Sequence, residues 1–258
     1  MRNESIEPVV AGVDGTLAGV RAVDLAAEEA TARVAPLVVV YTVEPGTDPA
    51  LLRGHRRLLD LVVSRAQAEH PALSVESDLV YGEPVEALVR WSARACLMVV
   101  GHREGRSGGR SVAAEVAARS VAPVIVYRRL AVPQPAGDRP VLVAVAGRSG
   151  ERGPFAFAFD EAQLRGAALV ACYVPAGKVE RPDDLLVEAL DGWPARYPDV
   201  EVRRQVLSGP DVAGLLSGAS DAAGLAVVGV DGYRALIDTA GCPVAVVPDR
   251  PAGEPDPR

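Results

Sequence analysis

The sequence predicts an α/β protein that contains one parallel-sheet unit twice. The first observation is a series of short, β-branched apolar runs without alternation, as expected for strands that are covered on both faces. The second is that alanine- and glutamate-rich segments with helical periodicity separate these runs. The third is an internal repeat, in which segments of the second half match segments of the first. Together they predict two α/β domains in tandem.

The first half alternates five expected strands with four expected helices. A helix follows each of the first four strands, which favours a parallel sheet with helices on both faces. The strands are expected at 9–14, 37–43, 74–80, 97–100 and 124–127, and the helices at 19–33, 49–69, 83–93 and 111–120.

The repeat is visible at both ends of each half. EPVVAGVDGT, near the start, resembles RPVLVAVAGRS, so that Gly15 matches Gly147 at an offset of 132. LMVVG, ending at Gly101, matches LAVVG, ending at Gly229, and here the offset has shrunk to 128. The second half has therefore lost residues, chiefly between its fourth and fifth apolar runs.

The polar segment QPAGDRP, at 134–140, is the expected linker, because proline and glycine interrupt helices. We place the domains at 1–133 and 134–258. A tether this short keeps the two halves adjacent, so a pseudo-symmetric pair is expected.

Composition excludes several classes of partner. The formal net charge is -7 and the pI is about 5.1, so nonspecific attraction to nucleic acid is absent. No apolar run reaches the roughly 18 residues of a membrane span, and no apolar signal region is present. The three cysteines, Cys96, Cys172 and Cys242, lack the paired spacing of a zinc site and are expected to be inert buried thiols. We therefore expect a cytoplasmic protein that binds neither a membrane nor a metal.

A ligand site is expected where the strands of the first half end. Ligands of open parallel sheets bind beyond the carboxyl ends of the strands, which here include Asp14 and Gly101. The stretch VVGHREGRSGGRSV places a basic, glycine-rich loop after the fourth strand, with Ser111 at the start of the next helix. Glycines and helix-terminal amides favour phosphate, and a serine in this place also caps a helix. A phosphate cradle and a solvated turn both remain open at this point.

The order of motifs resembles the universal stress protein family. The matching features are a strand ending VDG, a later VVG before a glycine-rich loop, a serine at the next helix start, and a final strand APVIVY. Two copies in one chain resemble the tandem members of the family, and the likeness runs from Pro8 to Pro248. The resemblance implies two adenine-nucleotide α-hydrolase-like (Rossmann-like) domains. It also implies a role in the stress response through nucleotide binding or regulatory interaction.

The resemblance also implies a set of ligand-binding residues. Members that bind ATP hold it between a carboxylate after the first strand, backbone groups after the second, and a loop. The loop pattern is Gly, two residues, Gly, nine residues, then Gly-Ser or Gly-Thr. Asp14 matches the carboxylate, Val43 the backbone position, Gly101 the first loop glycine and Ser111 the hydroxyl. The predicted cofactor-binding residues are Asp14, Gly15, Val43, Gly101, Gly105, Arg110, Ser111 and Val112.

The loop departs from the family pattern in three ways. Gly105 comes one place late, the stretch from Gly101 to Ser111 is short, and Arg110 stands where a glycine is expected. One interpretation is that Arg103, Arg106 and Arg110 replace lost amide contacts with charge-assisted bonds to phosphate. The other is that the loop is solvated and the site takes no cofactor.

The second half is expected to bind no nucleotide. Ala146 replaces the carboxylate, and the segment after Val228 is too short for a phosphate loop. Its last strand, 244–247, and the last strand of the first half, 124–127, resemble the edges through which the family dimerises. We expect these two strands to form an internal pseudo-dimer, and a homodimer of the whole chain is a further alternative.

No catalytic constellation is present. The sequence lacks a Gly-x-Ser-x-Gly elbow, a His-Glu-x-x-His pair and a Walker-type Gly-Lys-Ser/Thr, so we expect no enzyme and no catalytic residue. The expected function is nucleotide binding or regulatory interaction, with ATP in the first domain and an unidentified protein partner. One alternative is a scaffold that recognises a protein or small ligand without nucleotide. A weak ATPase is the second alternative.

Other polar residues are interpreted as solvated. His102, directly after Gly101, is expected to be a surface loop histidine, and His55 is expected to face water. The segment RGHRRLL, from Arg53, gives a basic patch on the second helix. Contact with an anion or an acidic partner and a solvated face all remain open for it.

Two pairs of adjacent carboxylates are also interpreted as solvated faces. They are Glu28 with Glu29 and, one repeat later, Asp160 with Glu161. Neighbours on a helix diverge by about 100°, so neither pair is expected to act as paired acids.

Overall fold

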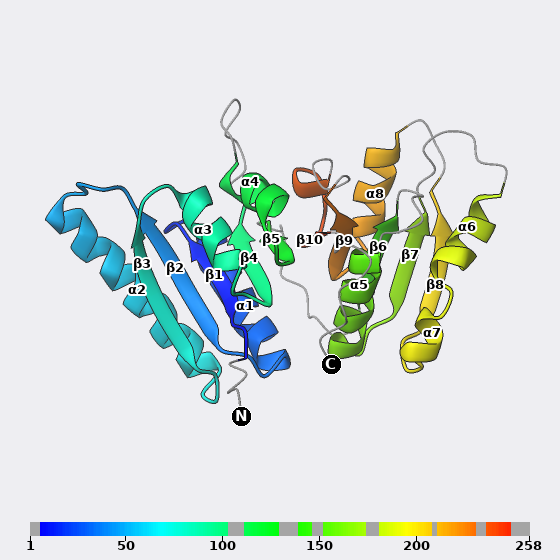
Figure 1. Cartoon of the computed structure of the whole chain (residues 1–258), viewed down its shortest axis with the longest axis horizontal. Coiled ribbons are helices and arrows are strands. Elements are labelled where there is room, and N and C mark those ends of the chain that lie inside the picture. Colours follow the sequence, from blue (N-terminus) through cyan, green and yellow to red (C-terminus); the bar gives the residue numbers. More distant parts are fainter. Residues whose placement is uncertain are drawn as a thin grey trace. The chain divides into compact units, whose positions relative to one another are not determined.

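The computed structural model divides the chain into two compact units, Met1–Arg129 and Leu130–Arg258 (Figure 1). Gly105, Arg110 and Ala146, which the sequence singles out, lie outside the part of the chain that the structure describes. The described residues are 6–102, 111–128, 139–145, 152–173, 181–207, 211–230 and 236–248.

The first unit is a five-stranded parallel sheet in the order β3-β2-β1-β4-β5. The predicted strands and helices of this half are confirmed, with ends that differ by one or two residues. The elements are β1 Val9–Val13, α1 Leu17–Ala32, β2 Leu37–Val43, α2 Pro49–Glu69, β3 Val75–Tyr81, α3 Pro84–Ser92, β4 Leu97–Gly101, α4 Val112–Arg119 and β5 Val124–Tyr127.

The second unit has a parallel sheet with the equivalent order, β8-β7-β6-β9-β10. Two short helices, α6 and α7, stand where the first unit has the long α2 (Figure 1). The elements are β6 Val141–Val145, α5 Arg152–Arg165, β7 Leu169–Tyr173, α6 Pro182–Ala189, α7 Trp193–Arg196, β8 Val202–Val206, α8 Val212–Ser220, β9 Leu225–Gly229 and β10 Val244–Val247.

The core of each unit lies between its sheet and its helices. In the first unit α1 contacts α2 and α3 contacts α4, as right-handed crossovers on the two faces of the sheet require (Figure 1). In the second unit Cys172 lies in β7, and Cys242 lies two residues before β10. Both cysteines are buried. Burial raises the pKa of these two thiols to about 12, so they are buried as expected, whereas Cys96 is only half-buried.

A buried ion pair recurs in the first helix of both units. On α1, Glu29 pairs with Arg33, and on α5, Glu161 pairs with Arg165 at 2.9 Å. The two carboxylates lie one repeat apart, at the offset of 132, and both are buried. The expectation of a solvated face is therefore wrong for Glu29 and Glu161. The 100° between helix neighbours turns the second carboxylate of each pair inward, and an arginine one turn later neutralises it.

The end of β4 is packed directly against the start of α1. A Cβ on Gly101 would lie 2.6 Å from the backbone carbon of Ala18 and 2.7 Å from the nitrogen of Gly19. Neither contact can be relieved by a side-chain rotation, because both atoms belong to the backbone. In the second unit a Cβ on the equivalent Gly229 would lie no closer than 3.7 Å to its nearest neighbour, Pro154. Only the first unit therefore requires glycine here for packing.

We expect Arg165→Met to lower the free energy of unfolding by about 3 kcal/mol, because it removes an ion-pair partner from the fully buried Glu161. The matched control is Arg203→Met, which breaks an exposed pair with Glu201 and should cost less than about 1 kcal/mol. Urea unfolding of both variants measures the difference. Equal losses in the two variants would contradict the structural role of the buried pair.

We expect Gly101→Ala to lower the free energy of unfolding by about 1–3 kcal/mol, because the added methyl group meets the α1 backbone. Gly229→Ala is the control and should be neutral or slightly stabilising, since its methyl group meets only an ordinary contact. Thermal and urea unfolding report both effects. If the two alanines behave alike, the close packing of α1 on β4 is wrong.

Candidate functional site

The candidate site lies at the carboxyl edge of the first sheet, beside the point where the strand order reverses. From β1 the chain adds β2 and β3 on one side and then β4 and β5 on the other. Val10 of β1 pairs with Met98 of β4, so the loops that follow these two strands leave the sheet side by side. Open α/β sheets bind their ligands in this crevice.

Asp14 leaves β1 into a tight turn that starts α1. Its Oδ1 accepts hydrogen bonds from the backbone nitrogen of Thr16 at 2.9 Å and from the Thr16 hydroxyl at 2.6 Å. The Thr16 hydroxyl in turn accepts from Gly19 and caps the helix. The turn also needs a glycine, because Gly15 has a φ of 80°. The carboxylate is thus fixed in place and exposed at the edge of the sheet.

His102 joins the end of β4 to the start of α4. Its backbone nitrogen donates to the carbonyl of Tyr127 at 2.8 Å, and its Nδ1 lies 3.3 Å from the Ser111 hydroxyl. That hydroxyl also caps α4 by accepting from the nitrogen of Ala114 at 3.4 Å. His102 is only 6% exposed, so the expectation of a surface loop histidine is wrong. The imidazole holds Ser111 next to the strand end, although eight residues separate them in sequence.

The remaining described residues of the predicted site have different positions. Val43 ends β2, and its carbonyl accepts from the nitrogen of Gly82 at 2.9 Å, so a ligand would share this oxygen. Val112 is the first residue of α4 and is exposed. Gly101 is explained by helix packing, and the structure gives it no separate role toward a ligand.

Sequence analysis missed an aromatic pair beside this edge. The rings of Tyr41 on β2 and His55 on α2 stack with centroids 4.7 Å apart, so His55 does not face water as expected. Burial and, secondarily, the negative charge of Asp14 raise the pKa of Tyr41 above its ordinary value. The His55 Nδ1 is buried and has no hydrogen-bond partner in the described part of the chain. Leu58 lies against Gly15 in the turn after β1. The only signal in the sequence was that His55 precedes Leu58 by about one helical turn.

Neither a metal site nor a membrane-spanning helix is found among the described residues. No group of three or more histidine, cysteine or acidic side chains there could hold a metal ion. No helix in the same ranges is long and apolar enough to cross a membrane.

Comparison with known proteins gives consistent matches. The model of the universal stress protein family matches residues 5–128. A universal stress protein of Mycobacterium tuberculosis (strain H37Rv) is 32% identical over 259 residues, which cover 87% of this chain and 86% of that protein. A second one from the same strain is 31% identical over 223 residues, covering 78% and 80%.

A solved structure extends the match to the fold of the whole chain. The crystal structure of a universal stress protein from Archaeoglobus fulgidus superposes with a TM-score of 0.75 at 16% identity. The superposition covers 95% of this chain and 97% of the archaeal one. Because a relative is 32% identical over most of both chains, the chain belongs to the universal stress protein family.

Proposed function

We propose that the first unit binds an adenine nucleotide at the carboxyl edge of its sheet and that the chain acts by binding and not by turnover. The observation that carries this proposal is the convergence of Asp14, after β1, with His102 and Ser111, after β4, at the reversal of strand order. A fixed carboxylate and a helix-capping hydroxyl that follow two neighbouring strands suit a ligand that has both hydroxyl and phosphate groups.

Each of these groups has a distinct task toward such a ligand. The Asp14 carboxylate, held by Thr16, would accept hydrogen bonds from ribose hydroxyl groups. The Ser111 hydroxyl and the first amides of α4 would face the phosphates. A polar group of the base could supply the hydrogen bond that the His55 Nδ1 lacks. The nucleotide itself supplies phosphate charge and an aromatic base.

The second unit serves a different purpose in this proposal. It keeps the buried ion pair of α5 and the parallel sheet, whereas Ala146 removes the carboxylate on which the first site depends. We propose that it is a scaffold that binds no nucleotide and forms an internal pseudo-dimer with the first unit through the strands β5 and β10. Three cysteines without disulfide bonds suit a cytoplasmic location for the pair.

We expect ATP with magnesium, at about 100 times its Kd, to stabilise the protein by about 2.7 kcal/mol. Asp14→Asn tests the site, because the amide keeps an oxygen that accepts from Thr16 while it removes the charge. The variant should melt at the wild-type temperature without ATP and lose most of the shift with ATP. Asp191→Asn, an exposed residue of the second unit, is the control and should keep the full shift.

The outcome that contradicts the proposal is a full ATP shift in Asp14→Asn. Absence of any shift in the wild-type protein at millimolar ATP would instead favour the scaffold that works without nucleotide.

Arg110→Gly separates the two interpretations of the short loop. If the arginine replaces lost amide contacts, its removal weakens ATP binding several-fold, as expected for loss of one charge-assisted bond to phosphate. If the side chain obstructs the phosphates, the glycine strengthens binding. Isothermal titration calorimetry with ATP and magnesium distinguishes the two directions, and we expect weaker binding.

A further inference from the structure

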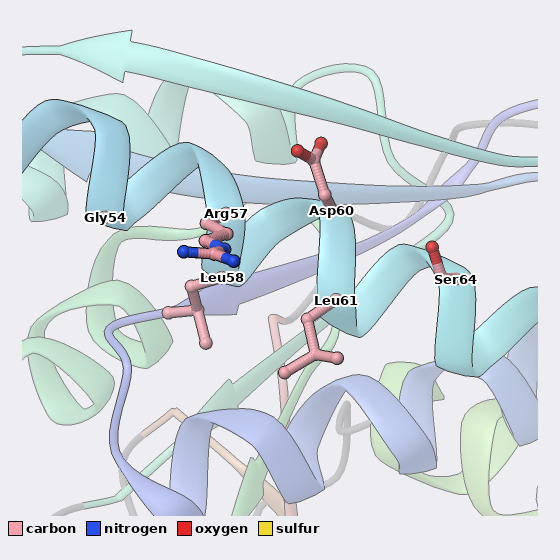
Figure 2. A pocket seen from close by; sticks show the side chains of 6 residues that line it. All are labelled: Gly54, Arg57, Leu58, Asp60, Leu61 and Ser64. Atoms are coloured by element: carbon pink, nitrogen blue, oxygen red, sulfur yellow. The ribbon is translucent and has the colours of Figure 1, made fainter.

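An open groove runs along the outer side of α2, next to α1. Its volume is about 500 Å³, and Leu58 and Leu61 point from α2 toward α1 (Figure 2). Leu61 is 66% exposed, and Leu17, at the start of α1, is 56% exposed. Apolar side chains that cluster in a concave surface mark a binding site more often than isolated exposed leucines do. The other lining residues are Gly54, Arg57, Asp60 and Ser64.

Arginines cluster at one end of the groove, where Arg57 lines it together with the carboxylate Asp60. Arg53, Arg56 and Arg57 are exposed and form no ion pair within the described part of the chain. At the other end Arg65 is neutralised, because it pairs with Asp24 of α1 at 2.9 Å and with Glu69 at 3.0 Å. Three unpaired arginines within two turns are unusual for a chain whose net charge is -7. Their free charge is complementary to an acidic partner.

The second unit shows that the fold does not need this groove. There α5 carries Phe155 and Phe159, and the ring of Trp193 on α7 stacks on Phe159 with centroids 5.4 Å apart. The ring of Tyr197 stacks on Phe159 as well, at 5.1 Å. In the second unit α7 therefore packs on α5 through stacked aromatic rings. Among the described residues of that unit, the short α6 and α7 stand in place of the long α2 that carries the leucines and arginines of the groove.

We propose that the groove along α2 binds an acidic amphipathic helix of a partner protein. Leucine-type side chains of that helix, three and four residues apart, would pack on Leu58 and Leu61, and its carboxylates would pair with Arg57 and its neighbours. From Gly54 to Ser64 the groove is about 15 Å long, which matches roughly three turns of a docked helix.

Other occupants fit less well. A flat membrane surface would cover the exposed Leu61 but not the half-buried Leu58, whereas the apolar face of a helix can pack on both. A symmetric contact between two copies is an alternative outcome of the test below. The groove and the proposed nucleotide site share Leu58, which lies against Gly15, so the peptide is titrated in the absence of nucleotide.

The test measures fluorescence anisotropy of a labelled acidic peptide with the full-length chain. The probe is a helix of about 14 residues with leucines on one face and glutamates on the flanks of that face. We expect saturable binding with a Kd below about 100 μM that weakens as salt is raised. Leu61→Glu should weaken binding at least about tenfold, because it places a carboxylate in the apolar floor.

Two further variants make the result specific. Leu164→Glu changes an exposed leucine of the second unit and should bind the peptide like the wild-type chain. Arg57→Glu should bind the acidic peptide more weakly and bind a matched peptide with lysine flanks more tightly than the wild-type chain does.

Several outcomes would overturn the proposal. These are no saturable binding of the acidic peptide, equal loss in Leu61→Glu and Leu164→Glu, or no change of charge preference in Arg57→Glu. Binding to phosphatidylcholine vesicles with phosphatidylglycerol that needs Arg57 but not Leu61 would assign the surface to a membrane. Self-association, measured by light scattering and lost in Leu61→Glu, would assign it to a second copy.

Discussion

The contact on which the site depends is the packing of the first turn of α1 against Gly101. There is no space for a Cβ between this residue and the backbone of Ala18. The contact brings the turn after β1 to the end of β4, so that Asp14 and His102 belong to one edge of the sheet. The family motif associates Gly101 with phosphate, but helix packing already requires a glycine there before any ligand binds. Other nucleotide-binding α/β folds also use a glycine for close packing of a helix on a strand.

The two copies have kept the same interior and changed at the surface. The ion pair of Glu29 with Arg33 recurs as Glu161 with Arg165, because a buried carboxylate that loses its partner is costly. Around that shared core, the first copy has the close contact at Gly101 and the long α2 with its open groove. In the second copy the packing around Gly229 leaves more space, and aromatic rings stack between α5 and α7. In our proposals the first copy provides the ligand and partner sites, and the second copy adds structure.

The sequence predicted the strands and helices of the first unit closely, because uninterrupted valine runs and glycine or proline at their ends are local signals. It also placed Asp14 and Ser111 correctly at element ends. It failed for His102, His55 and Glu161, because the burial of a polar side chain depends on residues far away in sequence. His102 is buried by the approach of α4 and β5, and His55 is covered by stacking on Tyr41, which no local pattern reveals.

A crystal structure of the full-length chain with a non-hydrolysable ATP analogue and magnesium tests the central claim most directly. The account predicts the nucleotide at the carboxyl edge of the first sheet, with its ribose at Asp14 and its phosphates at Ser111 and the start of α4, and no nucleotide in the second unit. A nucleotide bound at the carboxyl edge of the second sheet, or bound in the first unit away from Asp14, would contradict it.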